Sequence, residues 1–481
     1  MQTCRRRACP ACSFKKKKKK KKKAANSEKK ILIASQHTVA AAAAAFLASS
    51  SSSSSSNRLR ALEEGRQSSS SSSVEEKKAV RGRKNGRWSV VVLVVFFLIA
   101  GGAFAVVWLR EEKEKYLAIV DAGSSGCRAH VFSYEVDAGG RVVVDPTHAS
   151  LKATPGLSFF EHNPEAAGAS LKPLLEFVGS EAPPGTPIYL KATAGLRALN
   201  AEASRAILAS VRSTLREYHP GYAEAEIISG IQEAGFGWMA ANYLNGAFYS
   251  KSWTGVVEMG GASAQVSQLV PEEESVDKYS FGLEFGEERY RIYATSYLGY
   301  GMERARERLS KLMSPRETGD PCVATGAPGG GETVYDVLPG AGSYDECKAW
   351  VSRLFNNTER CDYSDCSNLI PSGTFQPHNL AATALLGFEN IYYTAASLNL
   401  PLPDIRVRDF ETGARNVCDN TFLVADGPKL CFAATYIHLF LHEGLKLPED
   451  KVLKVQQQVE GHDLDWALGA AIYEAAKSIT K

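Results

Sequence analysis

The sequence predicts an α/β protein of two similar lobes that face each other across a central cleft, preceded by one transmembrane helix. Three observations support this fold class. From Tyr116 onward, strand-like apolar runs alternate with helix-like amphipathic runs, which is typical of α/β layers. Residues 119–132 and 256–266 repeat one pattern of apolar strand, acid and glycine-rich turn. Residues 90–109 form an uncharged run of twenty residues.

The uncharged run predicts a transmembrane helix at residues 89–109, because about 20 apolar residues cross a ~30 Å hydrocarbon core. A buried core helix, the alternative, fits poorly with so long and uniformly apolar a run. Basic residues precede the run, whereas residues 110–115 mix three acids and three bases. The positive-inside rule then predicts a single-pass type II protein with its main part in the Golgi or secretory lumen, or outside the cell. Residues 31–48 are mildly apolar, but Gln36, His37 and Thr38 break the run, which disfavours the alternative of an h-region of a cleaved targeting peptide. A second span there would return the main part to the cytosol, which the clustered cysteines and the glycosylation signal of the second half disfavour.

Residues 1–88 predict a cytosolic low-complexity region without a packed core. They contain nine consecutive lysines at residues 15–23 and two serine runs. The whole chain is nearly balanced, with 56 Lys+Arg against 53 Asp+Glu. Because a lysine run is usually a solvated segment, we expect no nucleic-acid partner, and we expect membrane contact through residues 90–109.

Cysteine usage indicates an oxidising compartment for the second half of the chain. Six of the ten cysteines cluster there: Cys322, Cys347, Cys361, Cys366, Cys418 and Cys431. Six clustered cysteines suggest three disulfides, for which sequence alone permits fifteen pairings. Asn356 begins an N-glycosylation signal, which points to the same compartment. Residues 320–366 are rich in Gly, Pro and Cys and predict a disulfide-tied excursion.

The segment IVDAGSSGCRAHVF at residues 119–132 predicts a phosphate site with a metal ion beside it. Asp121 ends a strand, where its carboxylate can hold a divalent cation or the waters of that cation. The turn offers backbone N–H groups, hydroxyls and a fixed positive charge, from Ser124, Ser125, Gly126, Cys127 and Arg128. A plain β-hairpin without a ligand is the alternative interpretation.

The segment VVEMGGASAQV at residues 256–266 repeats this pattern with Glu258 as the acid. The phosphate-binding residues predicted here are Gly260, Gly261, Ala262 and Ser263, and Gln265 follows them. Two such turns suggest two half-structures that hold the phosphates of a nucleotide between them. We expect Asp121 and Glu258 to face Ca²⁺ or Mg²⁺, both of which take oxygen ligands.

Further apolar patterns predict the other strands and helices of the two lobes. Strands are expected at residues 188–191 and 227–228, an amphipathic helix at 202–218, a second helix from Gly230 and a closing helix at 464–479. Lobe I is predicted to comprise residues 116–229 and 455–481, and lobe II residues 230–454 with the disulfide-tied excursion.

Five motifs, in this order, resemble those of the apyrases, or ectonucleoside triphosphate diphosphohydrolases. They are DAGSSGCR at Asp121, KATAGLRAL at Lys191, SGIQEAGFGWMAANYL at Ser229, EMGGASAQ at Glu258 and DWALGAAIY at Asp465. The resemblance covers roughly residue 116 to the C-terminus, and members with one N-terminal anchor are the more similar. It implies two RNase H-like lobes of the actin-like and sugar-kinase superfamily, and metal-dependent hydrolysis of the terminal phosphate of nucleoside tri- or diphosphates. It also favours nearest-neighbour disulfides, Cys322–Cys347, Cys361–Cys366 and Cys418–Cys431.

The resemblance further implies individual roles. Glu233 corresponds to the catalytic glutamate that takes a proton from the attacking water, which Ser263 and Gln265 would orient. Thr193 would stand near the metal, and Tyr392 and Tyr393 are candidates to stack on the nucleobase. Without the resemblance, a glutamate in the first turn of a helix is explained by its favourable interaction with the helix dipole. Arg197 is expected to pair with an acid of the cleft or to form a structural ion pair.

Three residues depart from the family's pattern. Glu258 stands where Asp is usual, Cys127 where Thr or Ser is usual, and Ala264 where a hydroxyl residue is frequent. One extra methylene moves a carboxylate by about 1.5 Å, and a thiol is a poorer donor than a hydroxyl. These departures motivate an alternative function, a nucleotide-binding protein with weak turnover. An exopolyphosphatase-like hydrolase of the same superfamily is a further alternative, which the cysteine cluster and the membrane run disfavour.

Overall fold

The computed structural model describes residues 114–479, apart from gaps at 138, 219–221, 272–279, 314–318, 332–333, 335–336, 356–379, 381–382 and 420–426. The predicted low-complexity region, the transmembrane helix at 89–109, the sequon at Asn356 and the pair Cys361–Cys366 lie outside the described residues. Within them, no helix combines the length and the apolar character that a membrane crossing needs.

The first sheet carries the first acid-and-glycine turn. Its strands are β1 (Lys115–Ala122), β2 (Cys127–Val136), β3 (Val142–Val144), β4 (Ala149–Ala153), β5 (Ile188–Ala192) and β6 (Ala223–Ile227). Their order is β3-β2-β1-β5-β6, with β4 also paired to β2. The β1–β2 pair is antiparallel, and β5 and β6 continue the sheet in parallel. The predicted strand–turn–strand at residues 119–132 is therefore confirmed.

The second sheet repeats this arrangement around the second turn. Its strands are β7 (Gly255–Met259), β8 (Ser263–Leu269), β9 (Ser280–Phe285), β10 (Glu288–Leu298), β11 (Leu385–Glu389), β12 (Asp404–Arg406) and β13 (Val452–Val455). Their order is β12-β13-β11-β7-β8-β10-β9. Here β7 and β8 form the antiparallel pair, and β11 and β13 follow in parallel. Each turn thus joins the central strand of its sheet to an antiparallel neighbour, with two parallel strands on the other side.

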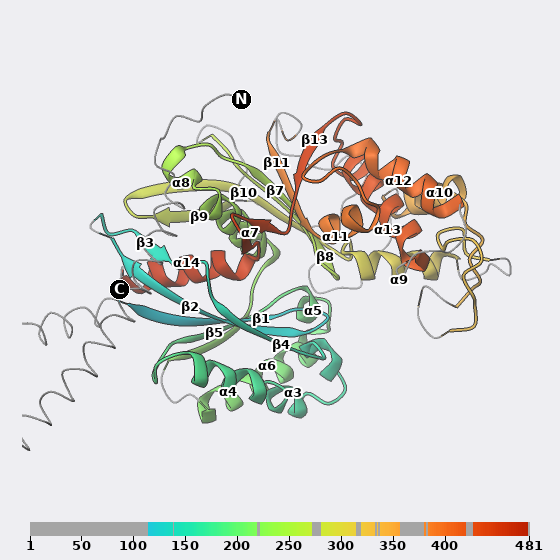
Figure 1. Cartoon of the computed structure of the whole chain (residues 1–481). Coiled ribbons are helices and arrows are strands. Elements are labelled where there is room, and N and C mark those ends of the chain that lie inside the picture. The colour runs from blue at the N-terminus through green and yellow to red at the C-terminus, as the bar shows by residue number, and fades with distance from the viewer. Residues whose placement is uncertain are drawn as a thin grey trace, which may run out of the picture. The chain divides into compact units, whose positions relative to one another are not determined.

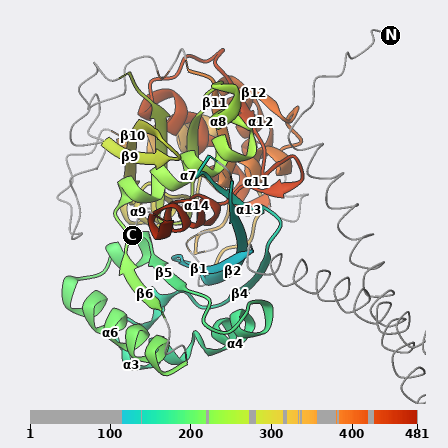
Figure 2. The ribbon, with the colours of Figure 1, turned by 90° about the vertical axis from the view of Figure 1, so that its left-hand side faces the viewer.

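Helices cover both faces of both sheets (Figures 1 and 2). The outer face of the first sheet packs against α3 (Glu165–Ala169), α4 (Lys172–Glu181) and α6 (Ala201–Tyr218). Between the sheets lie α7 (Gly230–Leu244) and α14 (Trp466–Ile479). The far face of the second sheet packs against α9 (Met302–Met313), α10 (Tyr344–Phe355), α11 (Asn390–Ser397), α12 (Val407–Asp419), α13 (Gly427–Leu439) and the π-helical turn η3 (Phe440–Gly444). Short elements complete the fold: η1 (Leu157–Phe160), α5 (Ala194–Arg197), α8 (Ala247–Ser250), β14 (Gln458–Val459) and β15 (His462–Asp463).

The two central helices explain why motifs so distant in sequence share one core. Ser229 caps α7 in a capping box with Gln232, which fixes the start of the helix about two turns before Trp238, which is buried in the core. A Cβ on Gly469 of α14 would lie 2.0 Å from the carbonyl oxygen of Phe236, so only glycine lets the helices cross this closely. Lys191 of β5 donates to Glu226 and Glu474, both at 2.7 Å, and so ties α14 to the first sheet.

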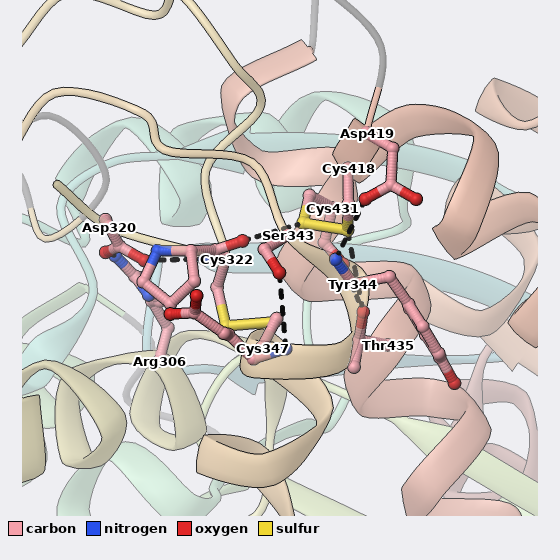
Figure 3. Close-up of a disulfide and its surroundings, with 12 residues drawn as sticks. Arg306, Asp320, Cys322, Ser343, Tyr344, Cys347, Cys418, Asp419, Cys431 and Thr435 are labelled. Atoms are coloured by element: carbon pink, nitrogen blue, oxygen red, sulfur yellow. Dashed lines mark hydrogen bonds and ion pairs between the residues drawn. A yellow bond between two sulfur atoms is a disulfide. The ribbon is translucent and has the colours of Figure 1, made fainter.

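Two disulfides hold the helices behind the second sheet (Figure 3). Cys322 is bonded to Cys347 of α10, and Cys418 of α12 is bonded to Cys431 of α13. All four residues are fully buried. The expected nearest-neighbour pairing is confirmed for these two pairs.

Candidate active site

Both acid-and-glycine turns line one pocket. The pocket is lined by Asp121, Gly123, Ser124, Ser125, Gly126, Cys127, Arg128, Lys152, Thr193, Ala194, Glu233, Glu258, Gly260, Gly261, Ala262, Ser263, Glu389, Asp465 and Trp466. A Cβ on Gly261 would lie 3.1 Å from Oγ of Ser124, so the two turns approach each other directly. The structure therefore brings together every residue predicted to bind phosphate or metal.

The second turn is held from behind by the start of α9. The N–H groups of Met302 and Glu303 donate to the carbonyls of Gly260 and Gly261, at 2.9 and 3.0 Å. A Cβ on Gly301 would lie 2.4 Å from the backbone nitrogen of Ser263, which requires glycine at this contact. The helix thus fixes the backbone of residues 260–263 before any ligand arrives.

The side chains of the two strand-end acids, Asp121 and Glu258, carry buried oxygens that no cation among the described residues neutralises fully. Oδ1 of Asp121 and Oε2 of Glu258 are buried and have no hydrogen-bond partner within the described part of the chain. Burial, and then the neighbouring carboxylates, raise the pKa of Asp121 and of Glu258 well above their ordinary values. Unpaired carboxylate oxygens lining one pocket are the ligands that a divalent cation takes, so these residues fit such an ion.

Thr193 lines the same pocket as these acids and the first turn. It is the N-cap residue of α5, is buried, and its backbone nitrogen donates to the carbonyl of Ala122 at 3.2 Å. Its position in the pocket agrees with the predicted place near the metal, although no contact in the structure defines its role.

Glu233 lies in the first turn of α7 and is held by Arg197. Nη2 of Arg197 donates to Oε2 of Glu233 at 2.7 Å, and Nη1 donates to the carbonyl of Ile228 at 3.1 Å. Both side chains are buried. The predicted pairing of Arg197 with an acid of the cleft is confirmed, and the partner is the candidate base itself. Since Arg197 takes Oε2, Oε1 is the oxygen of Glu233 outside this ion pair.

Ser263 and Gln265 occupy different positions relative to the pocket. Ser263 lines it, whereas Gln265 is buried behind the turn and is not among the lining residues. Nε2 of Gln265 donates to Oγ of Ser263 at 2.6 Å and to Oγ of Ser296 at 3.1 Å. Gln265 therefore acts on the pocket through Ser263, whose hydroxyl proton it leaves available to a ligand.

Cys127 borders the pocket but packs as a core residue. Its side chain is 2% exposed and belongs to the apolar cluster under the first sheet. Burial raises the pKa of its thiol to about 12, so the thiol is neutral. Cys127 thus contributes packing at the base of the turn more than a hydrogen bond to a ligand.

Tyr392 and Tyr393 do not line the pocket. They lie on α11, which begins directly after the pocket residue Glu389, and their rings meet edge to face at 5.5 Å. Tyr393 is 51% exposed. This places an accessible aromatic face one helical turn from the pocket rim.

Three charged pocket residues were missing from the predicted site: Lys152 of β4, Glu389 at the end of β11, and Asp465 before α14. Asp465 lies 3.4 Å from Nε2 of His130 and 3.8 Å from Nη1 of Arg128. Burial, and then Asp465, raise the pKa of Glu389. The sequence held a usable signal for Glu389, because it ends an apolar strand as Asp121 and Glu258 do. Lys152 has no such signal.

Comparison with known proteins identifies relatives of this chain. The pattern that defines the GDA1/CD39 (nucleoside phosphatase) family matches residues 107–481. The chain is 30% identical to probable apyrase 6 of Arabidopsis thaliana, over 75% of this chain and 72% of that protein. It is 27% identical to the guanosine-diphosphatase of Candida albicans, over 74% and 70% of the two chains. A crystal structure of nucleoside triphosphate hydrolases from Neospora caninum has a TM-score of 0.56 at 15% identity, covers 80% of this chain and 97% of its own, and so shares the fold.

Proposed function

Because this chain belongs to the GDA1/CD39 (nucleoside phosphatase) family and is a nucleotide phosphohydrolase, we propose that it hydrolyses the terminal phosphate of nucleoside tri- and/or diphosphates by base-activated water. One observation carries the proposal. A buried glutamate, oriented by a buried arginine, opens onto a pocket where two glycine turns meet beside unpaired carboxylate oxygens.

The two turns hold the phosphates in this mechanism. The hydroxyls of Ser124 and Ser125, the guanidinium of Arg128 and the backbone of residues 260–263 surround the terminal phosphoryl group and stabilise the charge that develops on its oxygens. Asp121 and Glu258 would hold a divalent cation, Ca²⁺ or Mg²⁺, which when bound neutralises phosphate charge. We propose that the phosphoryl group binds where the two turns approach each other.

Glu233 is the general base. Arg197 fixes the carboxylate through Oε2, and we assign Oε1 to accept the proton of the attacking water. Ser263, oriented by Gln265, donates to that water or to the phosphate beside it. Attack in line with the leaving oxygen needs no covalent intermediate, so the protein's contribution is positioning and charge stabilisation.

The membrane topology and the lobe boundaries remain part of the proposal. We propose one transmembrane helix at residues 89–109, a cytosolic N-terminus, and two RNase H-like lobes in the secretory lumen or outside the cell. The two buried disulfides support an oxidising compartment. The names apyrase and guanosine-diphosphatase among the relatives support nucleotide phosphate hydrolysis and do not bear on the compartment.

Phosphate release by the full-length protein, made in a secretory host, tests the proposal. ATP, ADP, GDP and UDP are supplied with Ca²⁺, Mg²⁺ or EDTA, and Glu233→Gln is compared with Glu202→Gln. Glu202 also lies in the first turn of a helix, α6, but is exposed and outside the pocket, so it controls for a role in the helix dipole. We expect the wild type and Glu202→Gln to release phosphate in a metal-dependent reaction. The rate should fall by about 10²–10⁴-fold in Glu233→Gln.

Two results would contradict the mechanism. Equal release by Glu233→Gln and the wild type would remove Glu233 as the base. Nucleotide binding without release from any substrate in the wild type would instead favour a binding protein, the alternative that Glu258 and Cys127 motivate.

A further inference from the structure

A second group of metal-ligating side chains lies behind the second sheet, among residues that do not line the phosphate pocket. His438 lies near the end of α13, and His442 follows one turn later in η3. Glu411 lies on α12, and Glu449 lies between η3 and β13. We propose that these four residues form a structural zinc site that joins α12 to the segment after α13.

Three of these residues have ligand atoms close enough to share one ion. Candidate ligand atoms of Glu411, His438 and Glu449 all lie within 4.8 Å of one another. Nε2 of His438 lies 3.0 Å from Oε1 of Glu449 and 3.8 Å from Oε2 of Glu411. Nε2 of His442 lies 3.6 Å from Oε1 of Glu449 but outside this group of three. Zinc bonds of about 2.0–2.2 Å in tetrahedral geometry place ligand atoms roughly 3.3–3.6 Å apart, so the side chains, and His442 most of all, would have to move toward a common centre to hold the ion.

The hydrogen bond on the far side of His442 fixes its tautomer for metal binding. Nδ1 of His442 lies 3.0 Å from the carbonyl oxygen of Leu447. A carbonyl only accepts, so Nδ1 carries the proton, and the neutral ring has a lone pair on Nε2. That lone pair faces a carboxylate oxygen of Glu449, which is repulsive unless a cation lies between them or the ring is protonated. A ring N–H bound to a backbone carbonyl is the usual outer partner of a zinc-bound histidine.

The second imidazole presents Nε2 to the same carboxylate. The rings of His438 and His442 are parallel within 2°, with centroids 5.8 Å apart. Nδ1 of His438 lies 3.5 Å from the hydroxyl of Tyr344, which Figure 3 shows beside the disulfides. His438 is fully buried.

The nearby positive charges occupy one side of the group. Arg415 and Lys348 contact Oε1 of Glu411 at 3.1 and 3.8 Å. Oε2, the other oxygen of Glu411, faces His438. The cations therefore orient Glu411 without filling the space between the carboxylates and the imidazoles. Two imidazoles with two carboxylates suit zinc better than the all-oxygen pocket does, which suits Ca²⁺ or Mg²⁺.

Titration of the full-length protein with Zn²⁺, in saturating Mg²⁺ that occupies the phosphate pocket, tests the proposal. His442→Gln is the main variant, because His442 is 41% exposed and its loss should leave the fold intact. His162→Gln is the matched control at an exposed histidine outside the group. We expect one zinc ion per wild-type chain by calorimetry, at least tenfold weaker binding in His442→Gln, and unchanged binding in His162→Gln. Co²⁺ should give the intense visible absorption of a tetrahedral ion in the wild type and lose it in His442→Gln.

Phosphate release with Mg²⁺ separates this site from the active site. His442→Gln should release phosphate as the wild type does, and Glu233→Gln should bind zinc as the wild type does. Absence of zinc binding, or equal zinc affinity in the wild type and His442→Gln, would overturn the proposal. Neither result depends on whether the protein hydrolyses nucleotides.

Discussion

Gly237 of α7 leaves the room that the longer acid Glu258 needs. A Cβ on Gly237 would lie 3.1 Å from Oε2 of Glu258, whereas an ordinary contact is 3.4–4 Å. This oxygen is buried, has no hydrogen-bond partner among the described residues, and belongs to the group that fits the divalent cation. The added methyl group of Gly237→Ala would therefore displace Oε2 of Glu258, an atom that we expect to bind the metal.

The expected displacement of Oε2 is about 0.3–0.9 Å, the difference between 3.1 Å and an ordinary contact. A misplacement of 1 Å at a reacting centre can cost about 10²-fold, so we expect about a tenfold loss of phosphate release and a higher requirement for Mg²⁺ or Ca²⁺. Stability should change little or improve, because alanine is favoured over glycine inside a helix by roughly 0.5–1 kcal/mol.

A double-mutant cycle with Glu258→Asp measures this coupling. Aspartate withdraws the carboxylate by about 1.5 Å, so alanine at Gly237 should then cost less than about twofold. Gly179→Ala in α4 is the control, because a Cβ there meets no atom within 4 Å. Full activity and an unchanged metal requirement in Gly237→Ala would refute the reasoning, as would the same tenfold loss in both backgrounds.

Three further predictions concern buried groups. Lys191→Met should lower the free energy of unfolding by about 3–5 kcal/mol in urea titrations, because it removes the cation 2.7 Å from Oε1 of the buried Glu474 and leaves Lys477 at 3.8 Å from Oε2. Adding Glu474→Leu should restore most of the loss, and an unaffected single variant would contradict this. Burial lowers the pKa of His130 to about 4, so the unfolded chain binds a proton at this residue below about pH 6.5, whereas the folded protein binds it only near pH 4. The group should therefore lower the free energy of unfolding by about 3 kcal/mol by pH 4. This loss should vanish in His130→Gln, and parallel stability–pH curves for the two proteins would refute the prediction. Iodoacetamide at pH 8 should not modify the buried, neutral thiol of Cys127 in the folded protein. Peptide mapping by mass spectrometry measures the labelling. Stoichiometric labelling of Cys127 would contradict the prediction, because it would show that the thiol is accessible and ionised.

The parts of the site that the sequence could predict are those written in short, local patterns. Each acid-and-glycine turn occupies a few consecutive residues, and the strand before it fixes where the acid points. Asp121 and Glu258 therefore emerged from the sequence together with their turns, and the structure brings both turns into one pocket. The nearest-neighbour pairing of the disulfides rests on the resemblance to the apyrases, because six cysteines alone permit fifteen pairings, and it holds for the two described pairs, 25 and 13 residues apart.

The rest of the site depends on sheet register and helix crossing, which short patterns do not encode. Glu389 reaches the pocket because β11 pairs in parallel with β7, which places Phe388 opposite Glu258. Lys152 arrives on β4 through its pairing with Arg128 of β2. The sequence also could not distinguish Ser263, which lines the pocket, from Gln265, which lies behind it, because both are buried on the same face of β8 and differ only in their distance from the turn that starts the strand.

The three departures from the family's pattern weaken the case for a mere binding protein once their surroundings are known. The extra length of Glu258 is matched by the space at Gly237. Cys127 and Ala264 are both buried in apolar clusters, so hydroxyls at these positions would face the core more than a phosphate. The donors that line the pocket, Ser124, Ser125 and Arg128, are intact, and Glu233 keeps its arginine. Because the residues that would bind, orient and deprotonate are present, Glu258 keeps a carboxylate at the pocket, and Cys127 and Ala264 are buried in apolar clusters, hydrolysis explains this arrangement better than binding alone.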